Sequence, residues 1–93
     1  MIILERSTLF DRSMRKFVKG NKKRALLVKK TLRLLLTNPR HPSLRLEKLQ
    51  NSKIWTIRID RGNRIFLVRI NASALLLVDI GSHDKYKSIN KKV

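Results

Sequence analysis

Four side chains suited to phosphate chemistry lie in the last part of the sequence, between Ile54 and Tyr86. Arg58 and Arg64 belong to two strand-like runs that flank a short glycine-containing turn, and His83 and Tyr86 follow a third apolar run. Arginine presents a planar fork that matches a phosphate, and histidine titrates near neutral pH and can donate a proton. We expect these residues to grip and cut a phosphodiester.

The charge balance of the chain points to an anionic partner. Its 93 residues include 23 lysines and arginines against six aspartates and glutamates, a formal net charge of +17. A field of this sign attracts polyanions and makes their binding depend on salt. We therefore expect nucleic acid as the leading partner, followed by an acidic protein that neutralises the charge.

Length and composition exclude several other classes of protein. Ninety-three residues, 42% of them apolar, suit one small domain over residues 1–93. The chain has no cysteine, and its apolar runs are shorter than the roughly 20 residues of a membrane span. We expect a cytoplasmic protein that has no membrane partner and no disulfide or thiolate chemistry.

The first half of the sequence predicts two helices. Apolar residues at a spacing of three to four begin a first helix at Ser7 or Thr8. Asn21 can cap a second helix, from about Lys22 to Thr37, which ends before Pro42. We expect its core-facing residues to be Ala25, Val28, Leu32, Leu35 and Leu36.

The second half alternates with a period of two, which is typical of strands. The runs with this pattern or with a continuous apolar core are 44–47, 54–60, 65–70 and 75–80. Together with a short strand at Ile2–Leu4, the order β-α-α-β-β-β predicts an α+β domain. Its antiparallel-rich sheet should carry both helices on one face.

The turn between the two arginine-bearing strands fixes how the arginines lie. A three-residue loop, Asp60-Arg61-Gly62, places Gly62 where a positive φ is needed and puts Arg58 directly opposite Arg64. A two-residue turn would put the arginines on opposite faces. We predict the three-residue loop. Adjacent like charges repel, so the pair suggests a phosphate site, with two solvated arginines as the alternative.

The order of elements, together with the patterns WTIRIDRGNRIFLVRI and LLLVDIGSHDKY, resembles that of the RelE/ParE superfamily of bacterial toxins. The closer likeness is to the RelE-, YoeB- and YafQ-type messenger RNA interferases, and it covers nearly the whole chain. The resemblance implies a RelE-like fold and the toxin of a type II toxin–antitoxin pair. It also implies an endoribonuclease that docks on ribosomal RNA and cuts mRNA in the ribosome, with an acidic antitoxin as partner.

The resemblance also implies roles for individual residues. Glu47, in Glu-Lys-Leu, matches the general base of YoeB-like members, and Arg64 matches the arginine that contacts the scissile phosphate. Arg58 matches a basic position in the tryptophan strand, and His83 matches the histidine of YoeB- and YafQ-like members. Tyr86 matches the aromatic residue that orients the base, although it follows the histidine by only three residues where relatives often show four or more.

The chemistry of these residue types agrees with that assignment. RNA cleavage without a metal needs a base for the 2′-OH, cations for the charge on phosphorus, and an acid for the leaving 5′-oxygen. We assign these roles to Glu47, to Arg58 with Arg64, and to His83. Two distant histidines and six scattered acids make no metal cluster, so we expect neither a metal nor a cofactor.

Further basic residues are candidates for binding RNA on the surface. They are Lys22, Lys23, Lys29, Lys30, Arg45, Lys48, Arg61 and Lys85. Charged faces are usually only solvated, but the predicted second helix carries basic residues from Lys22 to Arg33 and no acid, which favours a binding role.

Two other functions fit the sequence. A ParE-like inhibitor of DNA gyrase would share the fold and would not need Glu47 or His83. A non-catalytic RNA-binding module would keep its function without His83 and lose it in high salt. In either case His83 would be a surface residue, and Glu47 would pair with Lys48 or Arg45.

Overall fold

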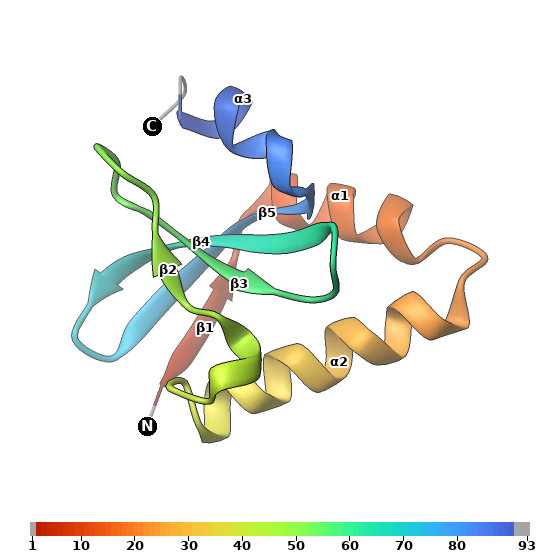
Figure 1. The fold of residues 1–93 in the computed structure, drawn as a ribbon, viewed down its shortest axis with the longest axis horizontal. Coiled ribbons are helices and arrows are strands. Elements are labelled where there is room, and N and C mark those ends of the chain that lie inside the picture. The colour runs from red at the N-terminus through yellow and green to blue at the C-terminus, as the bar shows by residue number, and fades with distance from the viewer. Residues whose placement is uncertain (1, 91–93) are drawn as a thin grey trace.

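The computed structural model describes residues 2–90, which form a five-stranded sheet with helices against it (Figure 1). The strands are β1 (Ile3–Arg6), β2 (Glu47–Lys48), β3 (Ile54–Arg58), β4 (Asn63–Asn71) and β5 (Ala74–Ser82). Their order across the sheet is β1-β5-β4-β3-β2, where β1 runs parallel to β5 and the other pairs are antiparallel. The predicted antiparallel-rich α+β fold is confirmed, and its long apolar strand, β4, is central.

The first two of the three helices begin at the predicted caps, Ser7 and Asn21. They are α1 (Thr8–Val18), α2 (Lys22–Thr37) and the short α3 (Tyr86–Asn90). Ser7 Oγ accepts a 2.9 Å bond from Phe10 N and donates one of 2.9 Å to Val78 O, which ties the start of α1 to β5. Asn21 Oδ1 accepts from Arg24 N at 3.0 Å. Within residues 2–90, no helix is both long and apolar enough to cross a membrane.

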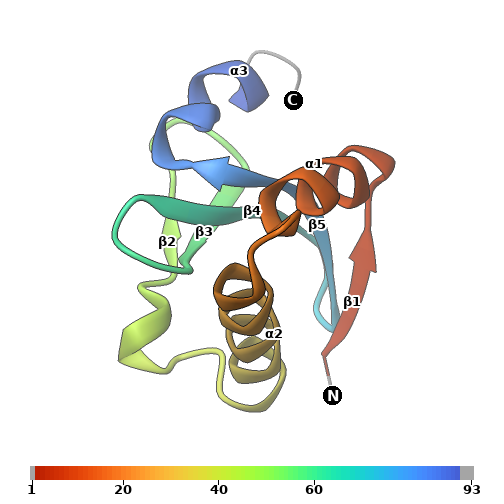
Figure 2. The ribbon, with the colours of Figure 1, turned by 90° about the vertical axis from the view of Figure 1, so that its right-hand side faces the viewer.

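The main core lies between the sheet and helices α1 and α2, which Figure 2 shows on the same side of the sheet. Its buried residues include Phe10, Phe17, Val28, Leu35, Ile57, Ile65, Leu67, Leu77 and Ile80. The predicted inner face of α2 is wrong at two positions, because Ala25 and Leu36 are exposed. Thr31 is buried in their place, and its hydroxyl donates to Leu27 O at 2.7 Å, which satisfies a polar group in the core.

A second, smaller core covers the opposite face of the sheet. Ile54, Phe66 and Ile89 form its buried centre, and Tyr86 packs against it. Ile89 and Tyr86 come from α3, which lies at the end of β5 and away from α2 (Figure 1). The sequence prediction had no third helix, so α3 is an addition to the expected order of elements.

The predicted alternating strand over 44–47 is mostly wrong. Pro42–Leu44 forms a 3-10 turn, and Arg45 then adopts a left-handed conformation with φ 45°. Leu44 is buried in this turn, so its apolar side chain packs into the core and does not belong to an alternating strand. Regular pairing starts only at Glu47, which makes β2 a two-residue strand at the edge of the sheet.

Candidate active site

The two arginines lie side by side, as the sequence predicted. Arg58, the last residue of β3, pairs directly with Arg64 of β4. A hydrogen bond of 3.1 Å from Ile59 N to Asn63 O closes the strands around a three-residue loop, Asp60–Gly62. Directly opposed residues of antiparallel strands point from the same face. The register therefore brings both guanidinium groups to one end of one face.

The loop closes in a different way from the one predicted. Gly62 does not have a positive φ; in residues 2–90 only Gly20 and Gly81 do among the glycines. The turn is held by the Asp60 carboxylate, whose Oδ1 accepts from Gly62 N at 3.0 Å and from Asn63 N at 3.1 Å. An aspartate that bonds the backbone two residues on makes a turn without left-handed glycine.

The same loop offsets the repulsion between the arginines. Arg58 Nε donates to Asp60 O at 3.3 Å, and Arg64 Nη1 donates to the same oxygen at 3.0 Å and to Asn63 O at 3.1 Å. These bonds fix both side chains, yet each guanidinium carries five N–H donors and uses few of them here. Both side chains are half-buried, so the remaining donors suit a phosphate that comes from solvent.

His83 lies next to this pair because β5 delivers it there. Arg64 pairs with Gly81 in β5, and two residues later His83 N donates to Gly62 O at 3.1 Å. The bond joins the end of β5 to the arginine loop. Tyr86 begins α3, and its ring centroid lies 5.7 Å from that of His83 with the planes inclined by 52°. The imidazole is exposed and the phenol half-buried.

Glu47 lies on the same face of the sheet as the arginines, on the edge strand β2. It pairs with Thr56 across β2 and β3, and Thr56 and Arg58 point the same way because they are two residues apart. Glu47 therefore lies on the strand next to that of Arg58. At the usual rise per residue of a strand, it is displaced from Arg58 by roughly 7 Å along the strand direction. Its side chain is exposed, and among residues 2–90 the ion pairs are Arg6–Asp11 and Lys85–Asp79, so it is in neither.

The remaining basic candidates divide by their place in the fold. Those on α2 are exposed but lie on the opposite face of the sheet from the arginine pair: Lys22, Lys23, Lys29 and Lys30. Arg61 is exposed at the tip of the arginine loop, Lys48 lies on edge strand β2, and Arg45 precedes β2. Of these residues, Arg61 belongs to the loop that joins the two arginine-bearing strands.

Lys85 is placed unlike the other basic candidates. Its ammonium group contacts Asp79 Oδ1 at 3.2 Å, Ile80 O at 3.0 Å and Ser13 Oγ at 3.4 Å. The side chain crosses Gly81 so closely that a Cβ there would lie 2.7 Å from Lys85 Cδ. Asp79 is 5% exposed. Lys85 thus fastens the turn that carries His83 onto β5.

Replacing Lys85 with methionine is expected to lower the free energy of unfolding by about 1–3 kcal/mol, because the buried Asp79 carboxylate loses its cation. The Lys85 side chain is 39% exposed, so the loss should fall in the lower part of that range. Urea unfolding measures it. In a double-mutant cycle with Asp79→Asn, the double variant should lose less than the sum of the single losses. Strict additivity would show that the two side chains are not coupled.

Sequence reasoning missed three residues that shape this site. The sequence patterns predict Asp60 only as part of the loop and Asp79 only as a strand residue, and they assign no role to Ile89. A signal existed for Asp79, since an acid inside the apolar run LLLVDI must find a cation or donors when buried. No comparable signal marked Ile89, which lies in a short, strongly basic segment.

No protein-family model and no curated protein matches the chain. Among solved structures, YafQ from E. coli superposes with a TM-score of 0.72 at 17% identity, over 90% of this chain and 96% of YafQ. A YoeB/ParE toxin from Agrobacterium tumefaciens gives 0.72 at 14% identity, over 89% and 99%.

A further similar structure comes from a complex with a second protein. The matching chain of the E. coli DinJ–YafQ toxin–antitoxin complex gives a TM-score of 0.72 at 16% identity, over 89% of this chain and 93% of that one. Identities this low establish the fold and leave activity open. The superpositions cover nearly all of this chain and of each compared chain, so the fold is shared over nearly the whole domain. The chain therefore has the fold of YafQ and of the YoeB/ParE toxin.

Proposed function

We propose that this protein is the toxin of a type II toxin–antitoxin pair and a metal-independent endoribonuclease that cuts mRNA in the ribosomal A site. The observation that carries the proposal is the order of groups across one face of the sheet. Glu47 lies on β2, Arg58 on β3 and Arg64 on β4, and His83 directly follows β5. A candidate base and a candidate acid thus stand on either side of two cations.

This order suits an in-line displacement at phosphorus. The attacking and leaving oxygens lie on opposite sides of the phosphorus, so the base and the acid must do so as well. Glu47 takes the proton of the 2′-OH, and the 2′-oxygen bonds to phosphorus. The bond from phosphorus to the 5′-oxygen breaks, and His83 donates a proton to that oxygen. The products are a 2′,3′-cyclic phosphate and a 5′-hydroxyl.

The arginines act on the charge that builds up between these steps. Their guanidinium groups are already held by Asp60 O, so little reorganisation is needed when the phosphate becomes more negative. Tyr86, tilted against His83, offers a ring on which the base next to the cut can stack. Exposed lysines of α2 and Arg61 supply sequence-independent attraction to ribosomal RNA.

The proposed role also implies a protein partner. A net charge of +17 favours an acidic antitoxin, part of which folds on binding and neutralises the toxin. Solved complexes of the same fold with a second protein, such as DinJ–YafQ, support this part of the proposal. Toxin, ribosome and antitoxin would meet in the cytoplasm.

Replacing His83 with alanine should lower the rate of mRNA cleavage by about 10²–10⁴-fold, the usual contribution of a positioned acid or base. The side chain is exposed, so the variant should fold normally. Induced expression followed by primer extension on a translated message measures the effect. The wild-type protein should arrest growth with new cuts in A-site codons, and His83→Ala should do neither.

The matched control is His41→Ala, which removes the other histidine of the chain. Its Nδ1 accepts from Ser43 N at 3.1 Å at the start of the 3-10 turn, away from the arginine pair. This variant should cut and arrest growth like the wild type. Growth arrest by His83→Ala with an intact message would overturn the nuclease assignment and make DNA gyrase the next target to assay.

A further inference from the structure

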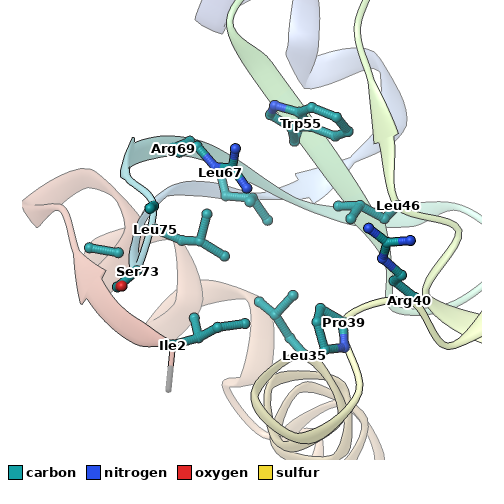
Figure 3. A pocket seen from close by; sticks show the side chains of 12 residues that line it. Ile2, Leu35, Pro39, Arg40, Leu46, Trp55, Leu67, Arg69, Ser73 and Leu75 are labelled. Atoms are coloured by element: carbon teal, nitrogen blue, oxygen red, sulfur yellow. The ribbon is translucent and has the colours of Figure 1, made fainter.

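The helix-bearing face of the sheet holds a pocket of about 400 Å³ that the proposed reaction does not use (Figure 3). Its walls are mainly apolar and include Ile2, Leu35, Leu46, Trp55, Leu67 and Leu75. We call it the Trp55 pocket. Trp55 faces the core shared with α2, whereas Arg58 points to the other face, so the pocket and the candidate active site lie on opposite faces of the sheet.

Two arginines flank the apolar walls. Arg40, beyond the end of α2, and Arg69, near the end of β4, line the pocket from different sides (Figure 3). Both are exposed, and within residues 2–90 neither takes part in the ion pairs, which are Arg6–Asp11 and Lys85–Asp79. An apolar hollow between two uncompensated cations selects a ligand that carries an apolar group close to negative charge.

We propose that the Trp55 pocket binds an apolar side chain of an acidic antitoxin segment whose carboxylates pair with Arg40 and Arg69. The inference rests on the proposed function, since it takes the antitoxin as the occupant. Leu46, part of the wall, is 37% exposed, so an apolar side chain that covers it removes apolar surface from water. Arginine forks bind carboxylates in pairs of hydrogen bonds and would fix the register of the segment.

The composition of the pocket favours protein over RNA. Apart from Trp55 its apolar walls are aliphatic and suit an apolar side chain. A base could stack only on Trp55 or on the two arginines, so RNA is the competing occupant that the test includes. A segment seated here would leave the opposite face with Arg58 and Arg64 uncovered unless it continued around the edge of the sheet. The pocket therefore provides an anchor for the antitoxin that is separate from the residues of catalysis.

Binding can be measured through Trp55, the only tryptophan of the chain. The probe is a synthetic peptide of alternating aspartate and glutamate around one central leucine, and the control peptide has serine in place of the leucine. The leucine peptide should change the Trp55 fluorescence and shift its indole N–H resonance. The serine peptide should bind about tenfold more weakly or worse. Equal binding of both peptides would overturn the proposal, because charge alone would then explain it.

Two double variants separate the pocket from general electrostatics. Arg40→Glu with Arg69→Glu should weaken the leucine peptide about tenfold or more, whereas Arg12→Glu with Arg15→Glu, the same charge change on the exposed side of α1, should have a much smaller effect. An equal loss in both would contradict the inference, as would a Trp55 response to hexauridine RNA and not to the peptide. An Arg64→Ala protein should bind the leucine peptide like the wild type, so failure of the nuclease proposal leaves this test intact.

Discussion

Replacing Arg64 with alanine is expected to lower the rate of RNA cleavage by about 10²–10³-fold, the usual effect of removing one group that stabilises developing charge. Arg64 pairs with Arg58 and with Gly81, so its guanidinium stands between the candidate base and the candidate acid. Its two hydrogen bonds to loop carbonyls are partly exposed, and their loss should cost only about 1 kcal/mol in stability. Cleavage of a defined message on purified ribosomes, with urea unfolding in parallel, measures both quantities.

Two further variants test the reason for this effect. Arg61→Ala removes the neighbouring arginine, which is exposed at the loop tip, and should change cleavage by less than about tenfold because it loses only long-range attraction. Arg64→Lys keeps the charge but not the planar fork, so it should recover only part of the rate. If Arg61→Ala were as damaging as Arg64→Ala, the site would depend on summed charge and not on a positioned guanidinium.

The helical half of the fold was predictable because its signals are local. Ser7 and Asn21 are good caps, the bounds of α2 agree with the structure, and the break between the helices lies where the sequence placed it. The inner face of α2 was less predictable. Leucines occur around most of the helix, and only the packing decides that Thr31 points inward and Leu36 outward.

The candidate site was predictable as far as register determines it. A loop of three residues necessarily sets Arg58 opposite Arg64, and that pairing is present. The means of closing the loop was not predictable, since glycine and an aspartate side chain both satisfy such a turn and the sequence contains both. The structure selects Asp60.

Contacts between distant segments were beyond the sequence patterns. Lys85 was expected to bind RNA, yet its partners include Ser13, 72 positions away in the chain. The docking of α3 depends on Ile89 meeting Ile54 and Phe66, and a basic five-residue helix has too little intrinsic stability to be expected alone. These contacts are long-range packing, which no local periodicity encodes.

Replacing Phe66 with alanine is expected to lower the free energy of unfolding by about 3–5 kcal/mol, because the ring is fully buried and leaves a cavity. Phe66 lies on the face of the arginine pair and packs with Ile89 and Tyr86 of α3. Its loss should also let α3 move and shift Tyr86, lowering cleavage by up to about 10²-fold. Urea unfolding and ribosomal cleavage, under conditions where the variant stays folded, measure the two effects.

The matched control is Phe10→Ala, which empties an equally buried position in the core on the other face of the sheet. Its loss in stability should be similar, but it has no contact with the core beneath α3, so cleavage by the folded protein should change little. The milder Phe66→Leu keeps the comparison available if the alanine variant does not fold. Equal losses of cleavage in the Phe10 and Phe66 variants would mean that α3 adds nothing to the site beyond general stability. A selective loss in Phe66→Ala would instead show that the small core positions Tyr86, and that the third helix belongs to the site as well as to the fold.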